Sequence, residues 1–388
     1  MTEPTTSRSD TTSAARTAGP TRVVWDLGVR AFHWLLVAGV AGALATGLLE
    51  RKSLFDLHVY LGTAIGVLVL FRVVWGFSGS TYARFASFVC SPFTALGHLR
   101  DLLTGKAPHH VGHNPLGTWM ILALLTTITA LLATGVIVLG GVAKEGPVKA
   151  FATYAFGHAA KTVHEGLAFG LMGLIGLHVL GIVVESLRTR ESLVGAMIHG
   201  RKKNRADDIG AAAATARPFI ALVLAGCAIA GAYAGTEALA RLPARGVPGP
   251  VLDKVYAAEC GACHTPHHPS IAPAATWQAI MANLGDHFGD NADLDADAGQ
   301  RIGAYLTANA SERWDTRAAN RLRAPSASEP LRVTHTRGWK RLHRHVPGEA
   351  FASAAVGGRA NCARCHRDSD SGRFAARAIA IPQERTKP

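Results

Sequence analysis

Residues 116–139 read LGTWMILALLTTITALLATGVIVL, a run that contains no charged side chain. About 20 apolar residues are enough for an α-helix to cross the hydrocarbon core of a bilayer. Four other segments approach this length, at residues 29–49, 58–77, 164–187 and 218–238. The chain is 48% hydrophobic and 17% charged, and its apolar residues are concentrated before residue 240. We therefore predict an all-α protein with five membrane spans, followed by a small, mostly helical, loop-rich tail.

Much of the net charge of +13 lies in the connections between spans and the rest lies in an Arg-rich tail, which does not indicate a nucleic-acid partner. Lys and Arg favour cytoplasmic loops. Fourteen of them flank the spans on one side: Arg8, Arg16, Arg22, Arg30, Arg84, Arg100, Lys106, Arg188, Arg190, Arg201, Lys202, Lys203, Arg205 and Arg217. Five lie on the other: Arg51, Lys52, Lys144, Lys149 and Lys161. This bias predicts a cytoplasmic N-terminus and, after five spans, a periplasmic tail in a bacterial inner membrane.

The tail contains two Cys-x-x-Cys-His motifs, Cys260-Gly261-Ala262-Cys263-His264 and Cys362-Ala363-Arg364-Cys365-His366. Two thiols at this spacing attach to the vinyl groups of a haem, and the adjacent histidine binds the iron. A zinc or redox pair is the alternative for a single copy. Two copies, each closed by histidine, use four of the six cysteines and favour covalent haem c. Such haem is attached outside the cytoplasm, in agreement with the charge bias.

Four histidines lie within the spans, where ionisable side chains are candidates for function: His33, His58, His164 and His178. The last two share the fourth span, about 40° apart around the helix and about 21 Å apart along it. One helix face therefore offers a ligand at each membrane level, with His58 matching His164 and His33 matching His178. This pattern predicts two bis-histidine haem b sites. Buried histidines that bond to neighbouring helices are the alternative.

The connection at residues 78–115 contains three histidines: His109, His110 and His113. A metal site is one interpretation. We favour a solvated loop leading into a helix, with Asn114 as N-cap and Pro115 at the first helical position. Four tryptophans near span ends are read as interfacial anchors: Trp25, Trp34, Trp75 and Trp119.

Residues 22–203 resemble the b-type cytochrome subunit of nickel–iron hydrogenases, within the prokaryotic cytochrome b561 family. The matching stretches are Val24 to Leu27 with Arg30 to Trp34, Leu57 to Gly62, Phe71 to Phe77, Tyr82 to Phe85, Gly112 to Gly117, and Val163 to Glu165. The resemblance implies two haems b on histidines of the first, second and fourth spans, here His33, His58, His164 and His178. It also implies electron exchange with the quinone pool, which in the hydrogenase relatives runs inward.

The sixth iron ligands in the tail have several candidates. Met281 is the only methionine there, and the histidines are His267, His268, His287, His335, His343 and His345. The tail resembles the periplasmic diheme cytochrome c family in Cys260 to His264, Trp277 to Met281, Asp286 to Gly289, Tyr305-Leu306, Arg332 to His343, and Asn361 to His366. The resemblance implies His287 and His343 as distal ligands. His335 and His345 flank His343, so the register and the pairing with each haem stay open.

These features predict transmembrane electron transfer by two haems b and two haems c, from quinol to a soluble periplasmic c-type haem protein or another acceptor. The predicted parts are a disordered leader (1–21) without a cleavable signal peptide, a four-helix cytochrome b domain (22–203), a linker with the fifth span (204–240) and the diheme domain (241–388). One alternative is a membrane-anchored haem reductase or peroxidase with an open c-haem. Another is the anchor subunit of a larger dehydrogenase or hydrogenase-type complex, and a homodimer also stays open.

Overall fold

The computed structural model describes residues 21–49, 52–203, 208–249 and 251–382. The leader predicted at residues 1–21 lies, apart from Thr21, outside the described residues.

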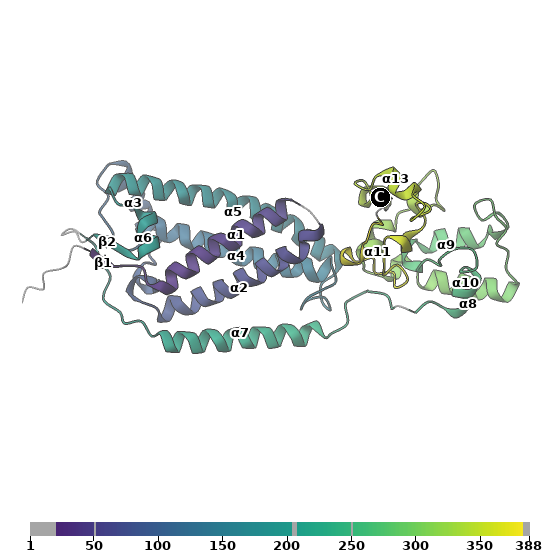
Figure 1. The fold of residues 1–388 in the computed structure, drawn as a ribbon, viewed down its shortest axis with the longest axis horizontal. Helices are drawn as coiled ribbons and strands as arrows, with labels where there is room; N and C mark the ends of the chain where they lie inside the picture. Colours follow the sequence, from purple (N-terminus) through teal and green to yellow (C-terminus); the bar gives the residue numbers. More distant parts are fainter. Residues whose placement is uncertain (1–20, 50–51, 204–207, 250, 383–388) are drawn as a thin grey trace, which may run out of the picture. The chain divides into compact units, whose positions relative to one another are not determined.

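Five long helices lie in the first two thirds of the chain. Their bounds are α1 Leu27–Leu48, α2 Phe55–Ser78, α4 Pro115–Gly141, α5 Tyr154–Thr189 and α7 Pro218–Ala240 (Figure 1). Each is long and apolar enough to cross a membrane, which confirms the predicted all-α membrane fold. The largest difference from prediction is in α5, which begins ten residues before His164. Polar His158 and Lys161 interrupt the apolar run there, although the backbone stays helical.

Local capping explains where several helices begin. Helix α4 starts at Pro115, and the Asn114 Oδ1 accepts a hydrogen bond from the Gly117 amide at 2.7 Å, as the sequence predicted. Two shorter helices, α3 Pro92–Leu103 and α6 Leu193–His199, begin after serine N-caps. Helix α6 ends at Gly200, whose φ of +83° is a left-handed conformation that glycine adopts without strain.

Two three-residue strands form a small antiparallel ribbon. Strand β1, Thr21–Val23, pairs with β2, Arg201–Lys203, so that Arg22 lies opposite Lys202. The buried cluster beside it includes Trp25 and Trp75, which are 6% and 8% exposed. The Trp75 Nε1 donates hydrogen bonds to the Asp26 carboxylate at 3.1 and 3.2 Å. The prediction of interfacial anchors is therefore wrong for these two tryptophans, because both side chains are buried in the protein and this carboxylate satisfies the Trp75 indole N–H there.

The chain divides into two compact units. The first contains residues 1–41, 64–126 and 171–227, and the second contains residues 42–63, 127–170 and 228–388. In the first unit a Cβ at Gly39 would lie 3.1 Å from the Ile65 side chain, and in the second a Cβ at Gly42 would lie 3.1 Å from Leu61. Small residues thus let α1 approach α2 closely within each unit.

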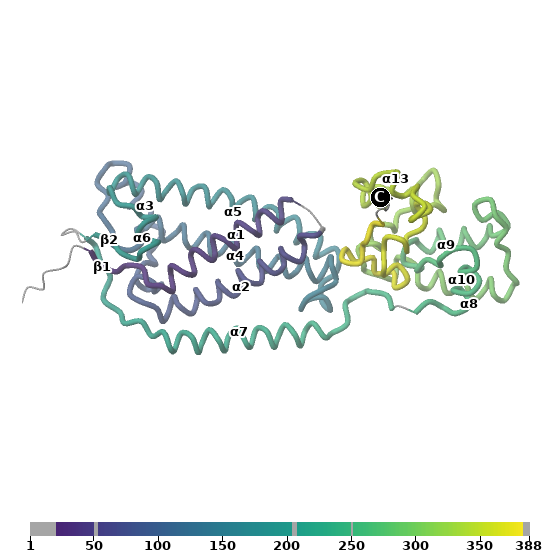
Figure 2. The backbone as a smooth tube through the Cα atoms, viewed as in Figure 1, coloured from purple at the N-terminus to yellow at the C-terminus, as the bar shows by residue number. Residues whose placement is uncertain are grey.

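After α7 the chain forms short helices with long connections (Figure 2). They are α8 Lys254–Glu259, α9 Ala274–Met281, α10 Ala296–Ala308, α11 Arg317–Leu322, α12 Arg337–Leu342 and α13 Gly348–Ala352. Single 3₁₀ turns along the chain are η1 Lys52–Leu54, η2 Thr81–Ala83, η3 Phe85–Ser87, η4 Pro269–Ile271, η5 Leu284–Asp286, η6 Ser311–Arg313, η7 Val333–His335, η8 Cys362–Arg364 and η9 Ala376–Ala378.

The tail has a core of its own, around Tyr256, Trp277, Ile302, Leu306 and Trp339. Helix α10 packs against both α8 and α9 in this core. Asp295 caps α10 by accepting a hydrogen bond from the Ala298 amide at 2.8 Å, and Asp297 lies in the first turn, where a carboxylate favours the helix.

Candidate haem sites

Helices α2 and α5 bring His58 and His164 together in the second unit. Their ring centroids lie 6.2 Å apart. Two imidazoles that bind one iron from opposite sides, each with its nitrogen about 2 Å from the metal, have centroids about 6 Å apart. The pair therefore has the spacing that a bis-histidine haem requires.

The Nδ1 atom of His58 is held by groups from α1. The Thr46 Oγ1 lies 3.1 Å from it, and the Ala43 carbonyl oxygen also lies 3.1 Å from it. A carbonyl oxygen can only accept a hydrogen bond, so the proton of the neutral imidazole is placed on Nδ1. The lone pair is then on Nε2, the nitrogen that remains for a metal.

His164 has a matching environment from α4. Its Nδ1 lies 3.0 Å from the Thr134 Oγ1 and 3.1 Å from the Leu131 carbonyl oxygen. The threonines belong to one repeated sequence, Leu-Ala-Thr-Gly, at residues 44–47 and 132–135. In each copy a Cβ on the glycine would lie 3.4 Å from the Cε1 of the histidine. Our sequence predictions do not include this repeat, although it could have indicated that α1 and α4 each place a threonine against one of the two histidines.

The first unit holds His33 on α1 and His178 on α5, close enough for their charges to interact. The His33 Nδ1 is buried and has no hydrogen-bond partner among the residues that the structure describes. His113 lies nearby, and its buried Nδ1 likewise lacks a partner within the described part of the chain. Burial lowers the pKa of His113 to about 3, with a smaller contribution from the positive charge of Arg72. His113 is therefore neutral at physiological pH.

The first tail motif lies beside a histidine from the turn after α9. His264 and His287 have ring centroids 6.2 Å apart with planes inclined by 19°. Burial lowers the pKa of His287, and the neighbouring His264 lowers it further. A neutral imidazole is the form that binds a metal. The structure thus brings the predicted proximal and distal residues together at the spacing of an iron-bound pair.

The second tail motif has an equivalent arrangement. His343 follows α12 and lies 6.1 Å from His366 between ring centroids. The His343 Nδ1 lies 2.9 Å from the Trp339 carbonyl oxygen, and its ring stacks on the Trp339 indole at 4.3 Å. Phe374 lies 5.1 Å from the His366 ring. The carbonyl again selects the Nδ1–H tautomer, and the two aromatic rings supply an apolar boundary.

Three of the remaining candidates for distal ligands have other partners. The His268 Nδ1 accepts a hydrogen bond from the Ser270 amide at 3.1 Å, and burial lowers the pKa of His268 to about 4. The His335 Nδ1 lies 2.7 Å from the Glu329 Oε1. His345 accepts a hydrogen bond from the Arg344 Nε at 2.8 Å. Of the other two, His267 lies 5.6 Å from His264 between ring centroids, and Met281 packs against the tail core.

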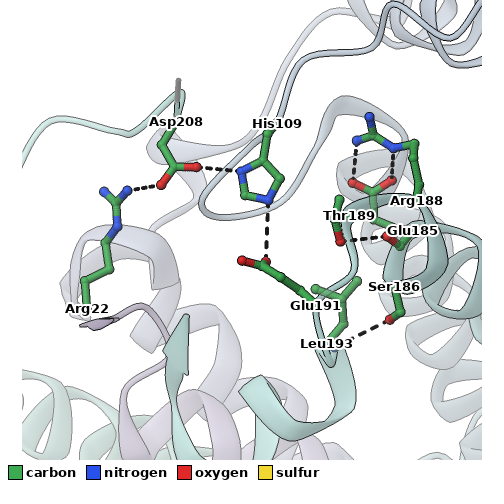
Figure 3. A network of polar contacts seen from close by, with 9 residues as sticks. All are labelled: Arg22, His109, Glu185, Ser186, Arg188, Thr189, Glu191, Leu193 and Asp208. Atoms are coloured by element: carbon green, nitrogen blue, oxygen red, sulfur yellow. Dashed lines mark hydrogen bonds and ion pairs between the residues drawn. The ribbon is translucent and has the colours of Figure 1, made fainter. Parts of the chain in front are cut away.

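The histidine loop of the first unit is not solvated. His109 is 8% exposed, and its Nδ1 lies 2.5 Å from Asp208, while its Nε2 lies 3.5 Å from Glu191 (Figure 3). Asp208 also forms an ion pair with Arg22. The prediction of a solvated loop is wrong for His109, because carboxylates from two distant segments, Glu191 and Asp208, lie against its buried ring. In the described part of the chain no three His, Cys, Asp or Glu side chains are arranged to hold a metal ion.

Comparisons with known proteins divide the chain in the same way. Residues 24–200 match the family Prokaryotic cytochrome b561, and residues 256–374 match the family Dihaem cytochrome c. A probable Ni/Fe-hydrogenase B-type cytochrome subunit from Bradyrhizobium diazoefficiens is 23% identical over 229 residues, covering 50% of this chain and 91% of that protein.

Two solved structures are similar to the tail in sequence. The diheme cytochrome type c from Shewanella baltica OS155 is 32% identical, with 33% of this chain and 92% of that chain covered and a TM-score of 0.28. The diheme cytochrome c from Rhodobacter sphaeroides is 35% identical, with 32% of this chain and 98% of that chain covered and a TM-score of 0.28.

Both families carry haem and transfer electrons, and the five apolar helices place the first of them in a membrane. Residues 256–374 therefore belong to the dihaem cytochrome c family and residues 24–200 match the prokaryotic cytochrome b561 family, so the chain is a membrane protein of electron transport with haem b and haem c.

Proposed function

We propose that this protein transfers electrons from quinol to a soluble haem protein of the periplasm, with two haems b and two haems c between them. His33 with His178 and His58 with His164 would hold the haems b. His264 with His287 and His366 with His343 would bind the haem c irons, and Cys260, Cys263, Cys362 and Cys365 would form the thioether links. The observation that carries the proposal is the recurrence of one spacing, 6.1 to 6.2 Å between ring centroids, in three separate histidine pairs.

The proposed orientation places the N-terminus in the cytoplasm and the tail in the periplasm of a bacterial inner membrane. Fourteen Lys and Arg residues near the spans on one side, against five on the other, support this arrangement. Covalent attachment of haem c outside the cytoplasm supports it independently. Quinol in the membrane is then the natural donor, and a soluble carrier on the tail side is the natural acceptor.

An optical difference spectrum of the purified protein tests the proposal. The anaerobic protein receives quinol first and dithionite afterwards. We expect quinol alone to reduce both the b-type and the c-type bands. If dithionite reduces both bands while quinol reduces neither, the proposed direction is wrong and the donor is a protein or lies in the periplasm. A His58→Ala variant is the matched control, because it should interrupt reduction of the c-type bands by quinol and leave their reduction by dithionite intact.

A second candidate function follows from the relative named as a hydrogenase subunit. In this arrangement the chain is the electron port of a larger complex, and electrons enter through the tail. Co-purification of a large catalytic subunit from the native membrane supports this candidate. The haem reductase or peroxidase alternative requires a five-coordinate c-haem, so a high-spin ferric signal from the tail would favour it over a carrier in which all haems are low-spin.

A further inference from the structure

The loop between α4 and α5 in the second unit contains a buried lysine. Lys144 is 2% exposed, and its Nζ lies 2.6 Å from the Asp315 Oδ2 of the tail. Within the loop itself the Nζ donates to the Ala152 carbonyl oxygen at 3.2 Å. The Asp315 Oδ2 also accepts a hydrogen bond from the Tyr154 amide at 2.8 Å. One tail carboxylate thus binds both ends of the loop.

Helix α11 supplies a second contact in the same region. The Arg321 Nε donates to the Tyr154 hydroxyl at 2.8 Å, and an Nη lies 3.2 Å from the His158 Nε2. The Tyr154 and His158 rings stack with centroids 5.8 Å apart. The guanidinium therefore meets a pair of rings in the first turns of α5, the helix that also carries His164.

The C-terminal segment of the tail supplies a third contact. Arg377 forms ion pairs with Asp56 at 2.7 Å and Glu145 at 2.9 Å. Asp56 lies in the first turn of α2, two residues before His58. Arg373 donates to the Lys144 carbonyl oxygen at 3.3 Å. These contacts connect the tail directly to the helix ends that precede His58 and His164.

A buried ammonium without a counter-charge is strongly unfavourable, and removal of one partner from a buried ion pair is costly. The Ala152 carbonyl alone does not neutralise the charge of Lys144. The ion-pair partner comes from Asp315, 171 residues away in sequence. The loop is therefore stable in this form only when the tail is docked on it.

The docking segments lie next to one of the two tail motifs. Phe374 contacts the His366 ring, and the Arg367 amide donates to the Ala378 carbonyl oxygen at 3.0 Å, so residues 373–377 lie beside the Cys362 motif. Helix α11 packs against α12, which ends one residue before His343. Both histidines of the Cys362 site are thus supported by the segments that bind the loop.

We infer that Asp315, Arg321, Arg373 and Arg377 form a clamp that fixes the Cys362–His366 site of the tail against the helix ends carrying His58 and His164. Resting on the proposed function, this assigns the Cys362 site as the one that exchanges electrons directly with the haem b site of the second unit. The Cys260 site then follows it in the sequence of transfers. The clamp makes the tail a fixed partner of the helix ends of the second unit rather than a tethered carrier.

Cysteine cross-linking in membrane vesicles tests the docking without reference to electron transfer. The background carries Cys90→Ser and Cys227→Ser, since the other four cysteines are bound as thioethers. A short bifunctional thiol reagent should join the pair Glu145→Cys and Arg377→Cys within one chain. Mass spectrometry should then detect the two cysteine-containing peptides linked to each other. The control pair, Glu145→Cys with Gln300→Cys, places an exposed thiol on the Cys260 half and should not be joined. Equal cross-linking of both pairs, or of the control alone, would overturn the assignment.

A kinetic test follows from the buried ion pair. In Lys144→Met, we expect quinol to reduce the b-type bands at the normal rate and the c-type bands about tenfold more slowly or worse, because an uncompensated Asp315 depopulates the docked arrangement. Dithionite should still reduce all haems. Unchanged c-band kinetics would contradict the clamp. If quinol reduces nothing even in the unmodified protein, the proposed direction fails, whereas the cross-linking result still decides the docking.

Discussion

The Thr134→Val substitution removes one hydroxyl from the His164 Nδ1 and keeps the shape of the side chain. The Thr134 hydroxyl lies 2.8 Å from the Ala130 carbonyl oxygen, to which it donates, so it accepts from the imidazole N–H at 3.0 Å. An acceptor on Nδ1 makes the imidazole a stronger electron donor through Nε2, which favours ferric over ferrous iron. Its loss should therefore raise the midpoint potential of the haem b that we propose on His58 and His164.

The size of the shift follows from the hydrogen bond. Such a bond contributes about 0.5–1.5 kcal/mol, and a one-electron potential moves about 59 mV for each 1.4 kcal/mol. The potential changes only by the difference in the free energy of this hydrogen bond between the ferric and ferrous states. The shift is also reduced because the Leu131 carbonyl oxygen still accepts a hydrogen bond from Nδ1 at 3.1 Å. We expect a rise on the order of 20 mV for Thr134→Val and about twice that for the double variant with Thr46→Val.

An anaerobic spectroelectrochemical titration that resolves the two b-type haems measures this shift. Thr134→Ser keeps the hydroxyl and should restore the original potential. Thr63→Val is the matched control, since the Thr63 hydroxyl donates only to the Val59 carbonyl oxygen at 2.9 Å within its own helix. The reasoning is refuted if Thr134→Val and Thr63→Val give the same shift, or if the other haem b moves instead.

Three further predictions concern the tail and the histidine loop. His343→Ala should convert one c-type haem from low-spin to high-spin, as measured by electron paramagnetic resonance, whereas His335→Ala should leave both c-type haems low-spin. The opposite result would show that His335, and not His343, is the distal ligand. Asp208→Asn leaves a buried His109 with a weaker partner and should destabilise the loop by about 2–3 kcal/mol, seen as faster amide exchange at residues 108–112. Because burial lowers the pKa of His268 from 6.5 to about 4, the unfolded chain binds this proton first as pH falls. The stabilisation is complete above pH 6.5 and declines towards pH 4, by about 3 kcal/mol. His268→Asn keeps an acceptor for the Ser270 amide and should flatten the pH dependence of thermal unfolding of the tail between pH 7 and 5, and an unaltered slope would show that another group titrates.

The sequence by itself determined the features that depend on short stretches of chain. Lipid requires a continuous apolar run, so the positions of the spans could be read directly, with errors only where polar residues such as His158 and Lys161 extend a helix beyond that run. The Cys-x-x-Cys-His motifs are equally local, because one haem must reach both thiols and the adjacent histidine. Helical geometry over fourteen residues of one span placed His164 and His178 at different depths.

Only the tertiary structure decided which distant groups meet. It brings His287 to His264 and His343 to His366, whereas His335 and His345 bind other side chains. It places Thr46 against His58 and Thr134 against His164, although the repeat that contains the two threonines was visible in the sequence.

Two buried polar side chains show the physical reason. Lys144 and His109 look like solvated loop residues in the sequence, because their partners Asp315 and Asp208 lie far along the chain. A charged or polar group can be buried only where folding supplies its partner. Local sequence records neither the burial nor the partner.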